Sequence, residues 1–358
     1  MNFPPRLEIY PQRILENARS VLGLCHSHGI EVASVTKVAC AHPAVVKALI
    51  EAGSDMLADS RVENLYTLRG LNTGLELLSL RIPTVSRARE MIENSDISLV
   101  SSMDGVRALA EAAAAWNKVH KVILMVDLGD LREGVWPDTL IDSALTITRS
   151  LPSLELAGIG ANLACYGGVI PSAENMGLLV QLHQHTEEAT GREIPILCGG
   201  NSANLPLLAA GGMPPDVNLL RIGETTLLGA NVIDRSPWPG TRQDTFRLAA
   251  EVVELERKPS VPIGETGQDA FGGTPTFVDR GIRQRAICNI GRQDTDIGNI
   301  YPVDPGIIVL GGSSDHLVLD VEEAVTPVKV GDEVAFTLGY SALLGASTSA
   351  YVKKVVVE

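Results

Sequence analysis

The sequence predicts an α/β protein: a (β/α)8 TIM-like barrel followed by a second, all-β C-terminal domain. Over residues 1–234, short apolar strands alternate with helical stretches of about 10–15 residues, which implies right-handed parallel crossovers. Eight such strands close most naturally into a barrel, and the alternative is an open, doubly wound sheet. Beyond residue 234 the chain changes to short β-branched segments separated by Gly, Pro and Asp. We therefore expect two domains, 1–234 and 235–358.

The predicted elements follow one another regularly. Barrel strands are expected at residues 32–38, 56–58, 76–80, 97–101, 121–128, 155–163, 194–197 and 217–222. Helices are expected at residues 11–28, 42–52, 62–68, 86–92, 104–116, 139–150, 174–189 and 203–210, and a short strand at 7–10 precedes them. In the second domain, strands are expected at residues 245–255, 306–310, 317–321 and 350–357.

The composition narrows the class of protein. With 45% apolar and 20% charged residues, the chain is typical of a globular protein. The net charge of -14 argues against a nucleic-acid or membrane partner. The five cysteines are scattered without a C-x-x-C pair, and no stretch resembles a signal peptide or a transmembrane helix. These features predict a cytoplasmic protein with reduced thiols and no metal site.

Lys37 stands near the end of the first barrel strand, in the apolar run 32–40. An ammonium over a core is costly unless its pKa falls or it becomes neutral, and a Schiff base with an aldehyde cofactor is one way to become neutral. The alternative is a lysine whose stem lies on the strand while its amine reaches water.

Functional residues of a barrel gather after the strands, where all the carboxyl ends meet. Polar or charged residues fall there in this sequence: Lys37, Asp59, Arg132, Asn162, Ser202 and Arg221. The segments 199–203 and 221–225 follow the last two strands, where barrels often bind phosphate. As alternatives, Ser202 is only a helix N-cap, Arg221 only an ion-pair partner, and Tyr340, in the glycine-flanked stretch 339–345, only a core residue.

These motifs together resemble the alanine racemase superfamily, the fold type III enzymes that depend on pyridoxal phosphate. The resemblance rests on Thr36-Lys37, the segments 126–134 and 158–162, Asn201-Ser202, 221–223 and 338–340, and it covers almost the whole chain. The segments 126–134 and 158–168 most resemble the ornithine racemase branch.

The resemblance implies a role for each matching residue. Lys37 would bind the cofactor covalently and act as one acid/base. Arg221 would face the pyridine nitrogen, and Arg132 would lie near the phenolic oxygen. Asn162 and Asn201 would line the cofactor site, with Asn162 where alanine racemase has a ring-stacking histidine. The phosphate would be held by Ser202, Gly223, Glu224 and Tyr340.

The second acid/base of alanine racemase is a tyrosine from the partner subunit, and its context differs in this chain. When the segment 264–272 is aligned with alanine racemase without a gap, Asp269 occupies the position of this tyrosine. When two inserted residues are allowed, Phe271 occupies it. Phe271 cannot transfer a proton, so Asp269 is the candidate, and the alternative is an ordinary turn aspartate. Cys288 and Tyr301 are further possibilities.

Two loops of the second domain correspond to substrate contacts in the resemblance. The segment 311–315 places Ser314 and Asp315 near a substrate carboxylate, and the segment 292–294 places Asp294 at the substrate entrance. Asp294 would suit a distal ammonium, and a surface ion pair is its alternative. Because these loops belong to the second domain, the resemblance implies a head-to-tail homodimer in which that domain completes the partner's active site.

The sequence therefore predicts a racemase that depends on pyridoxal phosphate and moves the α-proton of a small-molecule substrate, ornithine or another basic amino acid. One alternative is another fold type III enzyme: an alanine or serine racemase, a D-amino-acid aldolase or a dehydratase. The other alternative is a protein of pyridoxal phosphate homeostasis.

Overall fold

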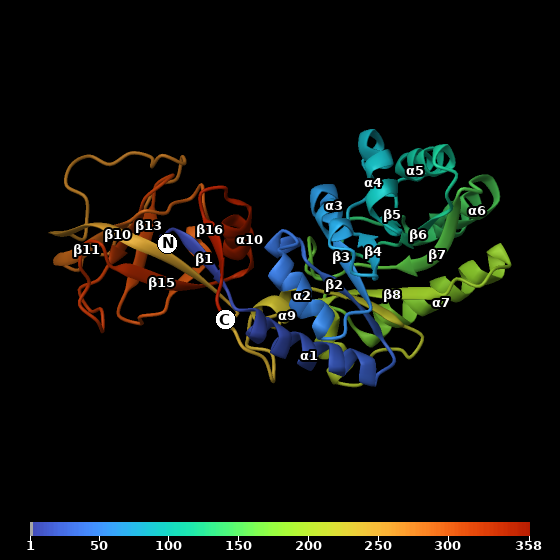
Figure 1. The fold of residues 1–358 in the computed structure, drawn as a ribbon, viewed down its shortest axis with the longest axis horizontal. Coiled ribbons are helices and arrows are strands. Elements are labelled where there is room, and N and C mark those ends of the chain that lie inside the picture. The colour runs from blue at the N-terminus through green and yellow to red at the C-terminus, as the bar shows by residue number, and fades with distance from the viewer. Residues whose placement is uncertain (1–2) are drawn as a thin grey trace. The chain divides into compact units, whose positions relative to one another are not determined.

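The computed structural model describes residues 3–358, which form two compact units (Figure 1). One unit comprises Gln12–Arg242. The other comprises Gln243–Glu358 together with the N-terminal segment that ends at Pro11. The first unit contains the predicted site residues Lys37, Arg132, Asn162, Ser202 and Arg221.

The first unit is a closed barrel of parallel strands. Its strands, each paired with the next and the last with the first, are β2 (Glu31–Val35), β3 (Met56–Asp59), β4 (Glu76–Ser79), β5 (Ile97–Val100), β6 (His120–Met125), β7 (Leu154–Gly160), β8 (Ile196–Asn201) and β9 (Leu219–Ile222). The predicted barrel is confirmed and the open sheet is excluded, because β2 pairs with β9 through residues 31–34.

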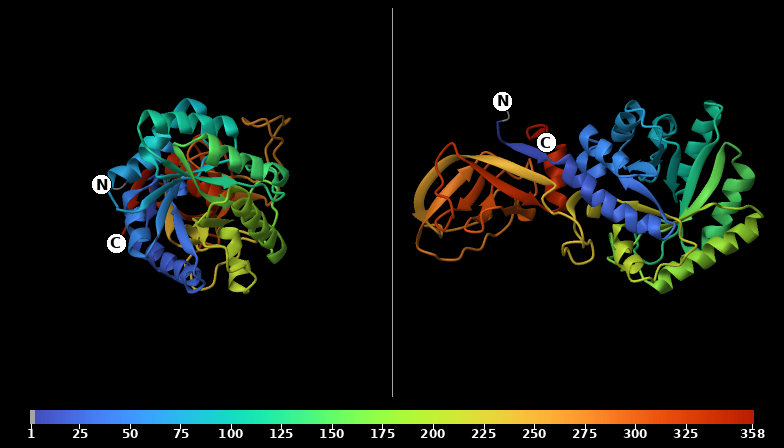
Figure 2. Two further views of the ribbon diagram at one scale, coloured as in Figure 1. Left: turned by 90° about the vertical axis from the view of Figure 1, so that its right-hand side faces the viewer. Right: turned by 60° about the horizontal axis from the view of Figure 1, so that its bottom comes forward.

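Helices surround the barrel strands in sequence order (Figure 2). They are α1 (Pro11–Ser27), α2 (Pro43–Glu51), α3 (Val62–Gly70), α4 (Ala88–Asn94), α5 (Met103–Ala115), α6 (Leu140–Ser150), α7 (Ala173–Thr190), α8 (Leu205–Ala209) and α9 (Glu224–Leu228). Short 3-10 helices η1 (Lys37–Ala39), η2 (Val85–Arg87), η3 (Pro137–Thr139) and η4 (Ser202–Asn204) stand between strands and helices.

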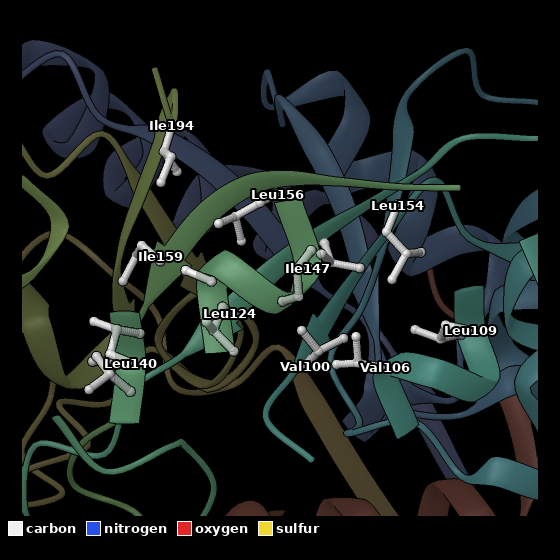
Figure 3. Packing of buried hydrophobic residues seen from close by; sticks show 14 of the residues in the cluster. Val100, Val106, Leu109, Leu124, Leu140, Ile147, Leu154, Leu156, Ile159 and Ile194 are labelled. Atoms are coloured by element: carbon white, nitrogen blue, oxygen red, sulfur yellow. The ribbon is translucent and has the colours of Figure 1, made fainter. Parts of the chain in front are cut away.

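The barrel strands bury both faces, which explains why they appear in the sequence as continuous apolar runs. In β6, Ile123 and Met125 belong to the cluster inside the barrel. Val122 and Leu124 of the same strand belong to the layer that packs against the helices, which Figure 3 shows between β5–β7 and α5–α6. Because successive side chains of a strand alternate, one apolar run fills both layers.

The second unit is built from β-strands that are mostly antiparallel. They are β1 (Arg6–Ile9), β10 (Phe246–Pro259), β11 (Ile282–Cys288), β12 (Ile300–Pro302), β13 (Ile308–Gly312), β14 (Leu317–Asp320), β15 (Glu333–Leu338) and β16 (Lys353–Val356). The long β10 joins the unit, because it pairs with β1 and β15 near its start and with β11 beyond a bulge after Val252. This all-β C-terminal domain is as predicted.

Three features of the second unit differ in detail from the sequence-based expectation. The unit begins at Gln243, later than the expected boundary after Asp234. It also includes β1, because β1 pairs antiparallel with β10 and parallel with β16. One helix, α10 (Tyr340–Thr348), and one 3-10 helix, η5 (Ile297–Asn299), lie among its strands. Pairing across hundreds of residues leaves no local pattern, so the sequence did not indicate where β1 belongs.

Between residues 3 and 358, no helix has the length and apolar character that crossing a membrane requires. The same residues contain no group of three or more His, Cys, Asp or Glu side chains arranged to hold a metal ion.

We expect the barrel to lose stability in mild acid because His120 is buried in the neutral form. His120 is 4% exposed and bonds Ser98 Oγ at 2.9 Å, and burial lowers the pKa of His120 from 6.5 to about 4. His120 therefore binds a proton below pH 6.5 in the unfolded chain but only below about pH 4 in the folded chain. Between these two pH values, this difference in proton binding lowers the free energy of unfolding by about 3 kcal/mol.

Chemical denaturation of wild type and His120→Asn at pH 7 and at pH 5 tests this expectation. The variant has no imidazole to protonate, so its free energy of unfolding should fall less between the two pH values. An equal fall in both proteins would show that other groups cause the acid sensitivity.

Candidate active site

Lys37 lies at the carboxyl end of β2, in the first position of η1. Val35 is the last residue of the strand, and Thr36 separates it from Lys37. The Lys37 side chain is partly buried rather than fully exposed.

The surroundings of Lys37 favour the neutral amine. Burial lowers the pKa of Lys37 below 10.5, and the charges of Arg132 and Arg221 lower it further, whereas Cys165 and Asp59 act in the opposite direction. Because burial and two positive charges disfavour its ammonium form, the amine of Lys37 is suited to act as a nucleophile or a base.

A buried carboxylate fixes the backbone before Lys37. Asp59, at the end of β3, is fully buried and accepts a hydrogen bond from Thr36 Oγ1 at 2.7 Å. Its other oxygen accepts bonds from the backbone N–H of Arg61 at 2.9 Å and from Asn64 Nδ2 at 3.0 Å. All of these bonds lie within the barrel, so Asp59 positions Lys37 rather than contacting a substrate.

Arg221 at the end of β9 is 4% exposed, and it is held by polar atoms of the neighbouring strands. Its guanidinium donates to Cys198 Sγ at 2.8 Å, to the carbonyl of Ala161 at 3.1 Å and to Asn162 Oδ1 at 3.2 Å. Among residues 3–358 no carboxylate forms an ion pair with Arg221, so the alternative of an ion-pair partner does not hold.

Asn162 has a buried donor that finds no partner. Its Oδ1 accepts from Arg221 and from Asn201 Nδ2, the latter at 3.2 Å. Its Nδ2 has no hydrogen-bond partner within the described part of the chain, although the residue is only 7% exposed. A buried amide without a partner costs free energy, so this atom indicates a site that a ligand completes.

The loops after β8 and β9 meet beside β2. Asn201, not Ser202, caps η4, because Asn201 Oδ1 accepts from the backbone N–H of Ala203 at 2.8 Å. Ser202 Oγ instead accepts from the backbone N–H of Gly223 at 3.3 Å. Gly223 approaches β2 so closely that an added Cβ would lie 3.0 Å from Val35 Cβ. A hydroxyl and a backbone N–H therefore converge where the sequence predicts a phosphate.

Glu224 follows in the same loop and forms an ion pair with Arg235, while burial raises the pKa of its carboxyl.

The loops after β6 and β7 bring Arg132 and Cys165 together. Arg132 forms an ion pair with Glu133 and donates from its guanidinium to Cys165 Sγ at 2.6 Å. Asp130 holds this arrangement: its carboxylate accepts from the backbone N–H groups of Cys165, Tyr166 and Val169 at 2.9–3.3 Å.

Cys165 and Asp130 are the functional candidates that the sequence reasoning missed. Both stand in the segments 126–134 and 158–168 that carry the family resemblance. Their relation depends on how two loops fold against each other, which the order of residues alone does not show.

The remaining predicted residues belong to the β-rich unit. Asp269 is exposed and accepts from the backbone N–H groups of Phe271 at 2.9 Å and Gly273 at 2.8 Å, and these bonds lower the pKa of its carboxyl. Cys288 is fully buried, which raises the pKa of its thiol to about 12, and Tyr301 is exposed on β12.

The predicted substrate contacts of this unit differ in exposure. Asp294 is 3% exposed and accepts from Ser349 Oγ at 3.0 Å and from the backbone N–H of Gly291 at 3.2 Å, so its carboxylate already has partners. Ser314 and Asp315 lie on the exposed loop between β13 and β14. Tyr340 begins α10.

A closed (β/α)8 barrel with a partly buried lysine and a buried arginine at its mouth is an arrangement typical of an enzyme. The comparison with family models specifies it further: the model described as "Alanine racemase, N-terminal domain" matches residues 9–231. The chain belongs to the alanine racemase family.

Two relatives match nearly the whole chain. The chain is 42% identical over 350 residues to ornithine racemase of Acetoanaerobium sticklandii, covering 98% of this chain and 99% of the relative. It is 41% identical over 351 residues to lysine racemase of Thermotoga maritima, covering 98% of each. The chain is therefore an amino-acid racemase, and the enzymes of its family depend on pyridoxal phosphate.

Solved structures agree on the fold. Alanine racemase of Streptomyces lavendulae superimposes with a TM-score of 0.72 at 18% identity, covering 99% of this chain and 98% of that one. Alanine racemase of Streptomyces coelicolor gives a TM-score of 0.73 at 19% identity with the same coverage.

We expect Arg132 to set the pH at which Lys37 reacts. Replacing Arg132 by Gln removes a positive charge, so the pKa of Lys37 should rise and the neutral amine should form only at higher pH. The rate at which the cofactor-free protein takes up pyridoxal phosphate, measured against pH, should shift to higher pH in Arg132→Gln.

The control variant is Arg107→Gln, which removes an exposed arginine of α5. It should leave the pH profile in place. A profile that does not move in Arg132→Gln would mean that the charge of Arg132 does not reach Lys37.

Proposed function

We propose that this protein is a racemase of basic amino acids such as ornithine or lysine that depends on pyridoxal phosphate and uses Lys37 as one of two groups that exchange the α-proton. The observation that carries the proposal is the partly buried amine of Lys37 at the end of β2, under the influence of Arg132 and Arg221. The two relatives that match nearly the whole chain, named ornithine racemase and lysine racemase, support the substrate class.

The residues at the barrel mouth fit this cofactor. The unpartnered Nδ2 of Asn162 offers a donor to a bound group, and Arg221 offers a buried charge beside it. The hydroxyl of Ser202, whose oxygen accepts from the backbone N–H of Gly223, offers a donor to a phosphate. When bound, pyridoxal phosphate withdraws electrons from the α-carbon of an amino acid and so makes its proton acidic.

Each residue then has a distinct task. Lys37 would hold the cofactor aldehyde, Arg132 would contact its phenolic oxygen, and Asn162 and Asn201 would line the ring. Ser202, the backbone at Gly223 and Glu224, and Tyr340 would hold the phosphate. Because a guanidinium is a permanent cation, Arg221 would oppose protonation of a ring nitrogen beside it and would favour return of the α-proton over competing reactions.

The proton chemistry of Lys37 follows from its environment. Burial and the charges of Arg132 and Arg221 favour the neutral amine of Lys37, which would accept the α-proton, and the resulting ammonium, destabilised by the same charges, would give the proton back readily. Racemisation requires a second such group on the other face of the substrate. The sequence predicts Asp269 of the partner subunit for it.

The β-rich unit would supply the remaining substrate contacts. We propose that Ser314 and Asp315 contact the substrate carboxylate region and that Asp294 serves the distal ammonium. Asp294 accepts hydrogen bonds from Ser349 and Gly291, and an ammonium would bind at the same carboxylate. We further propose a head-to-tail homodimer in which this unit completes the barrel mouth of the partner subunit.

Borohydride reduction and isotope exchange test the proposed function together. Reduction of the purified holoenzyme should fix the cofactor on Lys37, as identified by peptide mass spectrometry, and Lys37→Ala should lose the label. The exposed Lys47 of α2 gives the control, because Lys47→Ala should keep label and activity.

In deuterated water, one enantiomer of ornithine or lysine should become a mixture of both with deuterium at the α-carbon. Label on another lysine, or deuterium uptake with retained configuration in the wild type, would contradict the proposal.

Mixing inactive subunits tests the dimer. Lys37→Ala subunits lack the amine, and Asp315→Ala subunits lack a predicted substrate contact of the other unit. If each active site uses both chains, the mixture should recover activity that neither variant has alone. A monomer in sedimentation analysis, or a mixture that stays inactive although its subunits exchange, would contradict the dimer.

A further inference from the structure

We propose that Cys165 is the acid/base that works opposite Lys37. This inference rests on the proposed racemase function and assigns the second proton-transfer role to the barrel itself. It begins from the loop after β7, where the Cys165 side chain is exposed at the barrel mouth beside Arg132.

The position of Cys165 follows from the order of the strands. In the closed barrel, β7 is separated from β2 by β8 and β9, and β6 is diametrically opposite β2. Lys37 after β2, Arg132 after β6 and Cys165 after β7 therefore approach the mouth from different sides. Both Arg132 and Cys165 act electrostatically on the Lys37 amine, so these loops reach towards it. Two groups that face each other across a site can serve opposite faces of a flat bound molecule.

The chemistry of the pair suits proton transfer. Arg132 donates a hydrogen bond to Cys165 Sγ at 2.6 Å, so the sulfur lies directly beside a guanidinium. The backbone N–H of Cys165 is in turn bound to the carboxylate of Asp130, so the thiol is held in place by a buried group.

Four carboxylates of the barrel mouth are already occupied. Asp59 and Asp130 have their oxygens bound by backbone and side-chain donors inside the fold. Glu133 and Glu224 form ion pairs with arginines. The thiol of Cys165, by contrast, is exposed.

Ligand binding at this mouth has independent support three residues earlier in the same loop. The buried Nδ2 of Asn162 has no partner within residues 3–358, so the loop that carries Cys165 also carries a donor that a ligand would satisfy.

The proton balance of the reaction is simple. With one enantiomer, the neutral amine of Lys37 takes the α-proton and becomes an ammonium, while the thiol of Cys165 gives its proton to the α-carbon from the other side and becomes a thiolate. With the other enantiomer the thiolate takes the proton and the Lys37 ammonium gives one. Solvent exchange resets both groups between turnovers, and no oxidant or reductant takes part.

The test uses the holoenzyme with Cys165→Ser, which keeps a side chain that accepts from Arg132 but donates a proton poorly. Racemisation should fall by about 10²–10⁴-fold. The enantiomer whose α-proton Lys37 takes should still exchange that proton with deuterated water, with its configuration retained. The opposite enantiomer should lose exchange. Cys25→Ala, which removes a buried cysteine of α1, is the matched control and should behave as wild type.

A readout independent of turnover is alkylation of Cys165 by iodoacetamide, followed by peptide mass spectrometry. Adding ornithine to the wild-type holoenzyme should slow alkylation in proportion to occupancy of the site. Alkylation that ornithine does not slow would overturn the proposal.

Asp269→Asn discriminates between the two candidates. If this variant exchanges only one enantiomer while Cys165→Ser racemises normally, the role belongs to Asp269 and the inference fails. In that outcome the wild type still racemises and still carries the cofactor on Lys37, so the proposed function stands. A wild type that neither racemises nor binds the cofactor would instead remove the proposed function itself.

Discussion

The whole site depends on one unfavourable electrostatic interaction: an amine partly buried at the end of β2, with two arginines near it. A lysine in water has no reason to lose its proton near neutral pH. Here burial and the charges of Arg132 and Arg221 lower the pKa of Lys37. Other hydrogen bonds of the barrel stabilise this arrangement. Thr36 donates to Asp59, and Arg221 donates to Cys198 and Asn162.

The barrel makes this arrangement possible because its strands end at one mouth. Arg221, Asn162 and Asn201 come from three consecutive strands or the loops that follow them, and they form one hydrogen-bonded set. The loops after β6 and β7 are joined by Asp130, and together they support Arg132 and Cys165. Function is thereby placed on loops whose positions a rigid core defines.

Much of this was predictable from the sequence, and the failures have physical causes. Apolar runs that alternate with helices predicted the barrel, and residues after the strands predicted Lys37, Ser202 and Arg221. The pairing of β1 with β10 and β16 was not predictable, because hydrogen bonds between distant segments leave no local pattern. The contact of Arg132 with Cys165 depends on a turn closed by Asp130, which no spacing rule encodes.

The protein perturbs one amine, that of Lys37, by burial and by neighbouring positive charge. The most direct measurement is an NMR titration of Lys37 in the cofactor-free, full-length chain, assigned by comparison with Lys37→Ala. The account predicts a pKa below the ordinary lysine value of 10.5. A pKa at or above 10.5 would contradict it, because Lys37 would then be an ordinary charged lysine at physiological pH.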